Sequence, residues 1–162
     1  MELKLRKAVK SDMYSVLELI KELAIFENEP EAVSISEQTL IDDGFGEKPA
    51  FKVFVAELEN KIVGMALFYE RYSTWKGKSI HLEDLIVQNN HRGKGIGLSL
   101  YTKVLKYAHV NQFKRVAWEV LDWNKVAIDF YKSTGAKVFD LWRVAQIDEI
   151  SITKYLQNLK SN

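Results

Sequence analysis

Residues 81–101 read HLEDLIVQNNHRGKGIGLSLY, and the order of residue types in this stretch decides the fold class. It begins as an apolar, β-favouring run that ends at polar turn residues. Glycines follow at positions 93, 95 and 97, and apolar residues then recur at helical spacing. The stretch therefore predicts a strand, a glycine turn and a helix from about Gly95 to His109.

The glycine turn has the chemistry of an anion site. Glycines leave main-chain N–H groups unobstructed, and at the start of a helix these donors meet the positive end of the helix dipole. Phosphate is the usual anion at such a place, and Arg92 and Lys94 add charge-assisted hydrogen bonds. The spacing G-x-G-x-G fits neither a Walker loop nor a dinucleotide fingerprint. A solvated basic turn is the alternative, but the strand before it and the helix after it favour a phosphate cradle.

Composition excludes several classes of function. A chain of 162 residues, 47% hydrophobic and 28% charged, is predicted to form one domain over residues 1–162. The net charge of +1 gives no reason to expect nucleic acid or an acidic membrane surface as a partner. The absence of cysteine excludes disulfides and thiolate chemistry, and three scattered histidines predict no metal site. With neither a signal peptide nor a membrane-length apolar run, we expect a soluble cytoplasmic protein.

The rest of the chain predicts helices and strands mixed around one sheet. Ser11 or Asp12 caps a first helix, and a second helix starts near Ser36 and ends with Gly44 as its cap. FKVFVAELENKIVGMALFYERY is interpreted as a hairpin with a tight turn at residues 59–61. A strand is predicted at RVAWEVL, followed by a capped helix at VAIDFYKST. One or two last strands are predicted at AKVFDLWRVAQI, and a final helix at EISITKYLQNLK. This order predicts an α+β (mixed α/β) domain.

The glycine turn and the strand before it also carry a family resemblance. RGKGIG resembles the R/Q-x-x-G-x-G/A signature of the GCN5-related N-acetyltransferases, the GNAT superfamily. IKELAIFE, DGFGEKP, YSTWKGKSIHLED, LDWN and AIDFYKSTGA are similar, in the same order, to its spermidine/spermine (diamine) and thialysine acetyltransferase branch. The resemblance covers nearly the whole chain. It implies a twisted, mostly antiparallel sheet that is flanked by helices and splayed between its fourth and fifth strands, acetyl-CoA as co-substrate, and a homodimer.

In the family this turn holds the pyrophosphate of acetyl-CoA, and the resemblance carries that role to Arg92, Gly93, Lys94, Gly95, Ile96, Gly97 and Leu98. Leu85, Ile86 and Val87 would present main-chain groups to the acetyl carbonyl and the pantetheine arm, as an added strand pairs with a sheet edge. The N–H of Ile86 or Val87 then polarises the carbonyl. The resemblance also implies that Asn124 contacts the cofactor near the pantetheine while it caps its helix, and Lys132 is included among the cofactor-binding residues.

The expected acceptor is a primary amine, which must lose a proton before it attacks. An alkylammonium has a pKa of about 10.4, so its neutral form costs roughly 4.6 kcal/mol at pH 7. Glu83 and Asp84 are adjacent on the predicted strand, and alternation would point them to opposite faces. The resemblance implies that Glu83 binds the amine and accepts its proton through water. For Asp84 a salt bridge or a turn contact is the favoured interpretation, with substrate binding as the alternative.

Collapse of the tetrahedral intermediate releases coenzyme A thiolate, which needs a proton. Tyr131, in FYKSTGA, matches the tyrosine that the family uses as general acid. A phenol has a pKa of about 10 and a thiol about 8.5, so the surroundings must help the transfer. The positive end of the preceding helix and Lys132 are candidates for that help. Taken alone, Tyr131 beside Phe130 would be interpreted as an aromatic side chain packed on the sheet.

Acceptor selectivity is predicted from positions that match the acceptor pocket of this branch: Phe26, Glu27, Ser73, Thr74, Trp75 and Trp142. Glu27 would hold the remote ammonium of a diamine. The tryptophans would give apolar or cation–π walls, with core or dimer-interface packing as an equal alternative. Ser73-Thr74 stands where relatives that prefer spermidine or spermine carry an acidic residue, which favours a lysine analogue or short diamine. Asp140 is a further candidate whose correspondence is open.

The sequence thus predicts an acetyl-CoA-dependent N-acetyltransferase that acts on a small cationic amine such as thialysine, a lysine analogue, a diamine or a polyamine. Two rival hypotheses stay open. The acceptor can instead be a protein or peptide amine, because an open groove is compatible with the sequence. The chain can also be a non-catalytic acyl-CoA-binding module, although such a module needs neither Glu83 nor Tyr131.

Overall fold

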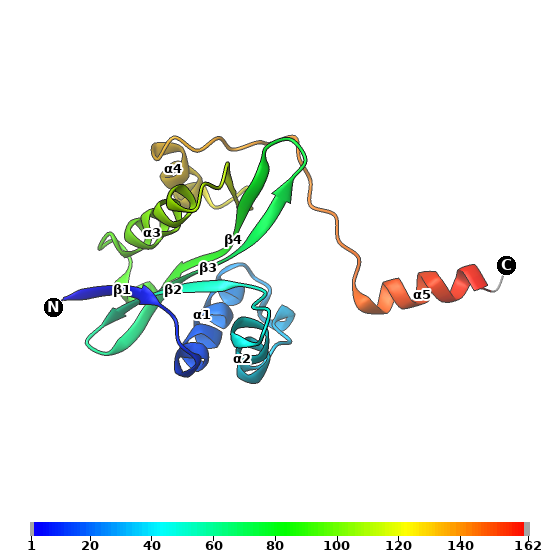
Figure 1. The fold of residues 1–162 in the computed structure, drawn as a ribbon, viewed down its shortest axis with the longest axis horizontal. Helices are drawn as coiled ribbons and strands as arrows, with labels where there is room; N and C mark the ends of the chain where they lie inside the picture. The colour runs from blue at the N-terminus through cyan, green and yellow to red at the C-terminus, as the bar shows by residue number, and fades with distance from the viewer. Residues whose placement is uncertain (1, 161–162) are drawn as a thin grey trace. The chain divides into compact units, whose positions relative to one another are not determined.

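The computed structural model describes residues 2–160, which contain a five-stranded sheet in the order β1-β2-β3-β4-β5 (Figure 1). The strands are β1 (Leu3–Lys7), β2 (Lys52–Leu58), β3 (Lys61–Ser73), β4 (Gly77–Val87) and β5 (Val116–Ala117). Neighbouring strands are antiparallel except β4 and β5, which are parallel. The predicted mixed α/β class and the mostly antiparallel sheet are confirmed.

The hairpin of β2 and β3 turns at Glu59 and Asn60, as predicted. Both residues have positive φ, 51° and 61°. Positive φ at both central positions gives a two-residue turn whose twist matches that of the flanking strands. β3 and β4 then run for thirteen and eleven residues. Together with β2 they form the centre of the sheet, on which the helices pack.

Helices α1 (Met13–Phe26) and α2 (Glu37–Phe45) cover one face of the sheet (Figure 1). Alternate residues of the central strands meet one stripe of each helix, since strands repeat every two residues and helices every 3.6. Each such side chain stabilises the fold by about 1.5–3 kcal/mol when fully buried. The buried cluster on this face consists of Met13, Val16, Leu17, Leu19, Leu40, Val53, Val55, Met65, Leu67 and Ile86.

Helix α3 (Ile96–Val110) packs on the opposite face. Phe54 and Phe68 point to this side, with ring centroids 6.1 and 5.2 Å from the ring of Tyr107 in α3. Leu100 and Val104 of the same helix are fully buried. Because only residues 88–95 connect β4 to α3, this packing holds the start of α3 near the end of β4.

The beginning of α2 follows the prediction and its end does not. Ser36 Oγ accepts the N–H of Thr39 at 3.1 Å and caps the helix. Gly44, predicted as the end of α2, lies inside the helix, and Gly46 is the cap. A Cβ at Gly44 would lie 2.8 Å from the ring of Phe51. Gly44 is therefore needed for close packing and not for helix termination.

Asp12 precedes α1, but its carboxylate does not cap the helix. It accepts hydrogen bonds from Arg6 at 2.6 Å and from the N–H of Val9 at 2.7 Å. Arg6 also pairs with Glu57 of β2 at 2.7 Å. The hydrogen bond from Arg6 lowers the pKa of Asp12. This network ties β1 to β2 and to the start of α1.

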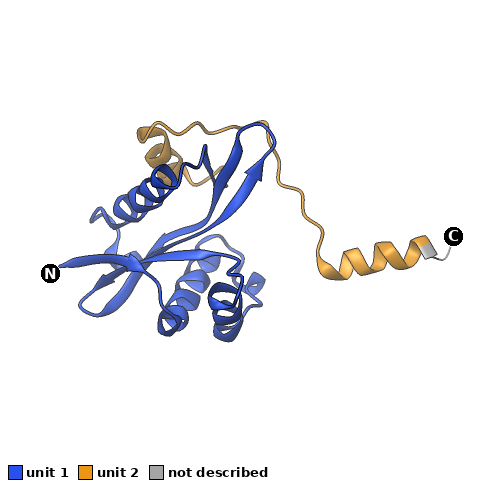
Figure 2. Ribbon diagram, viewed as in Figure 1, with its two compact units in different colours: residues 1–119 blue, residues 120–162 orange. Residues whose placement is uncertain are grey.

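The chain divides into two compact units, residues 1–119 and 120–162 (Figure 2). The second contains α4 (Lys125–Ser133) and the predicted final helix, α5 (Glu149–Lys160). Residues 136–147 form no strand, so the prediction of one or two last strands is wrong. A strand requires a hydrogen-bonded neighbour, and α4 and α5 offer none within this unit. The interpretation of residues 1–162 as one domain stays a prediction.

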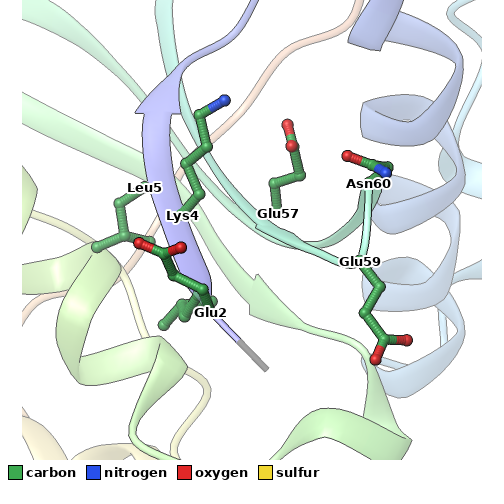
Figure 3. Close-up of a pocket in the computed structure, with 7 residues that line it drawn as sticks. Glu2, Lys4, Leu5, Glu57, Glu59 and Asn60 are labelled. Carbon is green, nitrogen blue, oxygen red and sulfur yellow. The ribbon is translucent and has the colours of Figure 1, made fainter.

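A hollow of about 600 Å³ lies beside β1 and the β2–β3 turn (Figure 3). None of its lining residues is a predicted site residue; they are Glu2, Leu3, Lys4, Leu5, Glu57, Glu59 and Asn60. Over residues 2–160, no helix combines the length and apolar character needed to cross a membrane. In the same residues, no three potential metal ligands of the His, Cys, Asp or Glu type are grouped to hold an ion.

Candidate active site

Strand β4 contains a bulge at Glu83. Leu67 of β3 pairs with Asp84 and the next residue, Phe68, pairs with Leu82, so Glu83 is the extra residue. A bulge interrupts the alternation of a strand and re-aims the side chain at that point. The Glu83 side chain is 50% exposed, between the buried Leu82 and the partly buried Asp84. The bulge thus presents one carboxylate to solvent from the middle of a largely buried strand.

The C-terminal half of β4 is open on the side of β5. β5 pairs only with Ile80 and His81, and within residues 2–160 no strand continues the ladder beside residues 82–87. Unpaired main-chain groups on such an edge can bind an extended ligand as an added strand. The resemblance implied a splay between the fourth and fifth strands, and the two-residue pairing of β5 is consistent with it.

Alternation identifies the main-chain groups that face this open edge. Gln88 donates its N–H to the carbonyl of Val63 in β3 at 2.9 Å. N–H groups two residues apart on a strand point to the same side, so the N–H of Ile86 also faces β3. The main chain of Leu85 and Val87 therefore faces the open edge. Of the two N–H donors predicted for the acetyl carbonyl, Val87 is aimed at the edge and Ile86 is not.

The glycine turn has the geometry of an anion cradle. Gly93 and Gly95 have φ of 73° and 77°, a conformation that glycine adopts without steric cost. A Cβ at either position would meet no atom within 4 Å. Gly95 is the N-cap residue of α3, and no side chain caps the helix. The first N–H donors of α3 are thus left for an outside acceptor.

Both cations of the turn are anchored beside it. Arg92 Nε donates to the carbonyl oxygen of Val87 at 2.9 Å, and its guanidinium carbon lies 5.2 Å from the ring centroid of Phe26. Lys94 Nζ donates to the carbonyl of Asn90 at 3.3 Å. This contact places Phe26, a predicted acceptor-pocket residue, beside Arg92 of the predicted cofactor loop. An adjoining hollow of about 380 Å³ is lined by Glu22, Gln88, Asn89 and Asn90.

Three carboxylates come together at β4: Glu27 from the end of α1, with Glu83 and Asp84. Burial raises the pKa of Asp84 to about 6, and repulsion from Glu83 and Glu27 adds to the rise. Burial also raises the pKa of Glu27. Among the described residues no hydrogen bond or ion pair holds Asp84, so the salt-bridge interpretation is wrong. Regular alternation along β4 would have placed Glu83 and Asp84 on opposite faces. The bulge interrupts this alternation, and the negative charge of Glu83 acts on Asp84.

Ser73, Thr74 and Trp75 lie at the tip of the β3–β4 hairpin. Ser73 is buried, and its hydroxyl accepts the N–H groups of Trp75 and Lys76 at 3.3 and 3.2 Å, so it holds the turn. Trp75 is 78% exposed. At about 3.3 Å per residue, the strand from residue 77 to Glu83 spans about 20 Å. Within one chain the structure does not bring these three residues together with Glu83.

The remaining predicted residues belong to the second unit. Asn124 Oδ1 accepts the N–H of Ala127 at 3.2 Å and caps α4, as predicted. Tyr131 is buried in the last turn of α4, with the exposed Lys132 next to it. Tyr131 is therefore about two turns along α4 from its positive end, and the dipole effect falls off within the first turn. Trp142 is 74% exposed in the segment between α4 and α5.

Sequence reasoning missed the residues that surround Glu83. His81 Nε2 lies 3.4 Å from Glu83 Oε2. Tyr69 lies near the same carboxylate, and burial followed by this negative charge raises the pKa of Tyr69. The two-residue spacing of His81 and Glu83 on one predicted strand was a usable signal. Tyr69 could not be found this way, because its position depends on the register between β3 and β4.

Comparisons with known proteins agree with this geometry. A model of the acetyltransferase (GNAT) family matches residues 13–136. The thialysine N-epsilon-acetyltransferases of Bos taurus and Mus musculus are 42% and 40% identical, over 82% and 83% of this chain and 83% and 84% of theirs. An integron cassette protein from the mobile metagenome of V. cholerae has a TM-score of 0.78 at 25% identity, over 97% of this chain and 99% of that one. An aminoglycoside acetyltransferase from an uncultured soil metagenomic sample has a TM-score of 0.72 at 28% identity, over 90% and 97%.

The fold and the site define an acyl-transfer enzyme whose sheet opens beside a glycine turn. The chain belongs to the GNAT family and is an acetyltransferase. The resemblance found in residues 81–101 and in the flanking segments is confirmed, together with the fold that it implied.

Proposed function

We propose that this acetyltransferase moves the acetyl group of acetyl-CoA to the primary amine of a small cationic acceptor. The observation that carries the proposal is the group of three carboxylates, Glu27, Glu83 and Asp84, beside the open edge of β4. A buried carboxyl group near two others is stabilised by a cation, which offsets both its burial and the repulsion. An amine that arrives protonated supplies that cation.

Main-chain geometry supports acetyl-CoA as the acetyl donor. The uncapped start of α3 and the open space at Gly93 and Gly95 fit a diphosphate, with Arg92 and Lys94 adding charge. The pantetheine arm pairs with the open edge of β4 as an added strand. The N–H of Val87 then hydrogen-bonds to the acetyl carbonyl oxygen, and this bond strengthens as negative charge develops there.

The proposed chemistry is direct transfer. Glu83 holds the ammonium group and takes its proton through a water molecule, because its side chain is half exposed at the bulge of β4, whereas the adjacent Asp84 is more deeply buried. The neutral amine attacks the thioester carbon, a C–N bond forms, and the C–S bond breaks. Tyr131 gives its proton to the departing thiolate, a role that rests on the family resemblance, with Lys132 as a neighbouring positive charge and Asn124 as a pantetheine contact.

Thialysine, a lysine analogue or a short diamine is the proposed acceptor within the broader class of diamines and polyamines. The relatives named as thialysine acetyltransferases align over most of the chain and support this choice. Glu27, whose pKa is raised by burial, is placed to gain from a second positive charge. Thr74 and Trp75 would join the acceptor pocket only across a dimer interface, because the length of β4 separates them from Glu83.

An acceptor screen tests the proposal. The purified full-length protein is incubated with acetyl-CoA and, separately, with thialysine, lysine, C3–C5 diamines, spermidine, spermine, sisomicin and a lysine-containing peptide, and products are identified by mass spectrometry. Acetylation of the small cations with the peptide unmodified is the expected result. Preferential acetylation of the peptide would favour a protein acceptor, and tight acetyl-CoA binding without any product would favour a binding module.

Asp84→Asn is expected to stabilise the free protein at neutral pH. The pKa of Asp84 rises from 3.8 to about 6 on folding, so the folded protein holds this proton more tightly than the unfolded chain. The free energy of unfolding therefore falls as the pH rises from 3.8 to about 6. Above this range the ionised Asp84 destabilises the folded protein by its full amount. Urea denaturation should find the variant about 3 kcal/mol more stable at pH 7 and equal to wild type near pH 3.5. The exposed Asp43→Asn is the control, and equal stability of Asp84→Asn and wild type at pH 7 would contradict the assignment.

We further propose that the protein is a homodimer. Ten large apolar side chains in the last part of the chain are exposed: Phe139, Leu141, Trp142, Val144, Ile147, Ile150, Ile152, Tyr155, Leu156 and Leu159. A twelve-residue helix such as α5 is marginal in water without tertiary packing. A second copy of this chain would cover these side chains.

Light scattering after size exclusion is expected to give twice the chain mass of 18.7 kDa. The double variant Leu141→Lys/Leu156→Lys should shift the protein to monomer, because it places charges among the apolar residues of the interface. Val126→Lys is the matched control, since Val126 is 84% exposed in α4, outside this set. A wild-type monomer at micromolar concentration would rule the dimer out.

A further inference from the structure

A cluster of polar side chains on β3 and β4 lies beside the Glu83 carboxylate. Tyr69 of β3 pairs directly with His81 of β4, and their ring centroids are 5.2 Å apart. Arg71, two residues along β3, places Nη1 at 3.3 Å from His81 Nδ1. His81 Nε2 lies 3.4 Å from Glu83 Oε2. The imidazole thus bridges a guanidinium on one side and the bulge carboxylate on the other.

The guanidinium fixes the tautomer of this imidazole. Arginine has only donors, so Nδ1 must accept its hydrogen bond, and the ring proton of the neutral imidazole must lie on Nε2. The Nε2–H group then faces the Glu83 carboxylate. In this tautomer neither ring nitrogen has a free lone pair toward the amine. His81 therefore cannot act as a second base, and its remaining role is to donate.

His81 is buried, with 8% of its surface exposed, whereas its neighbour Glu83 is half exposed. A long exposed carboxylate samples many rotamers, and a rigid donor from the sheet restricts them. The 3.4 Å separation exceeds that of a strong hydrogen bond. The contact therefore orients the carboxylate electrostatically and leaves its second oxygen for water and the amine.

We propose that His81 is a positioning residue for Glu83, and that Arg71 holds it in the Nε2–H tautomer. This inference rests on the proposed role of Glu83 in amine transfer. It adds that the acceptor amine meets a carboxylate whose orientation is set from within the sheet. Tyr69 of the facing strand pairs with His81 and packs against its ring.

The test compares His81→Gln with His81→Phe in the full-length protein. The glutamine amide nitrogen can take the place of Nε2 and donate, whereas phenylalanine keeps the ring and removes both nitrogens. His81→Phe should lower kcat/KM for the amine by roughly 10-fold, the lower end of what one hydrogen bond to a charged group contributes, because the contact is long. KM for acetyl-CoA should stay unchanged, and His81→Gln should recover most of the loss. In a Glu83→Gln background, His81→Phe should cause no further loss.

A second readout needs no turnover. ¹⁵N NMR of histidine-labelled protein distinguishes the two neutral tautomers, with the His81 signals assigned by their loss in His81→Gln and the exposed His109→Gln as control. The Nε2–H form is expected in wild type, and a mixture of tautomers in Arg71→Met. An Nδ1–H tautomer in wild type would overturn the proposal even if no acceptor were found. Full activity of His81→Phe, or additive losses with Glu83→Gln, would overturn it while leaving acetyl transfer intact.

Discussion

Glu83→Gln is expected to lower kcat/KM for the amine by about 10²–10⁴-fold, the usual contribution of a general base. Glutamine keeps the size of the side chain and one accepting oxygen, but it cannot remove a proton. The variant can use only acceptor that is already neutral, which rises tenfold per pH unit below the amine pKa of about 10.4. Its activity should therefore recover steeply between pH 7 and 10, as measured by release of free coenzyme A thiol.

The matched control is Glu70→Gln, another exposed acid of the sheet. Glu70 forms an ion pair with Lys52 at 3.1 Å at the surface, and such pairs contribute at most about 1 kcal/mol. Its kcat/KM should stay close to that of wild type. Tyr131→Phe should lower kcat by a similar order as Glu83→Gln, without the recovery at high pH. Undiminished turnover in both Glu83→Gln and Tyr131→Phe would remove the proposed mechanism.

Local signals in the sequence predicted much of the fold. The turn at residues 59–61, the cap at Ser36 and the start of α3 at Gly95 depend on a few adjacent residues. Strands in the last third were harder to predict. The predicted strand at 115–121 is reduced to Val116–Ala117, and residues 136–147 form none. Apolar, β-favouring residues give a strand only where another strand offers hydrogen bonds, and sequence alone does not show that neighbour.

In the candidate site, too, the features that depend on consecutive residues were predicted, and those that depend on strand pairing were not. The glycine turn and Glu83 were found from motif and chemistry, because each depends on consecutive residues. The bulge at Glu83 was not, since it appears only in the register of β3 against β4. This register shift has two consequences. The charge of Glu83 acts on Asp84, and the main chain of Val87, instead of that of Ile86, faces the open edge. The position of Ser73 at the hairpin tip also required the pairing.

Gly95→Ala is expected to raise the Kd for coenzyme A by about 10–100-fold, which corresponds to about 1.4–2.7 kcal/mol. The substitution changes two separate quantities, the stability of the fold and the affinity for coenzyme A. Gly95 has φ of 77°, and an L-residue pays roughly 1–2 kcal/mol for that conformation. The added methyl group would also project into the open space where the diphosphate is proposed to bind. Isothermal titration calorimetry with coenzyme A measures the change directly, without depending on the acceptor.

Gly77→Ala separates these two effects. Gly77 also has positive φ, 85°, and open space at its Cβ position, so it imposes similar backbone strain. It lies at the tip of the β3–β4 hairpin, with the length of β4 between it and the glycine turn. The two variants should therefore lose similar stability in urea, but only Gly95→Ala should lose affinity for coenzyme A. Equal affinity in both would mean that the start of α3 does not bind the diphosphate, since a methyl group in a diphosphate cradle cannot be neutral.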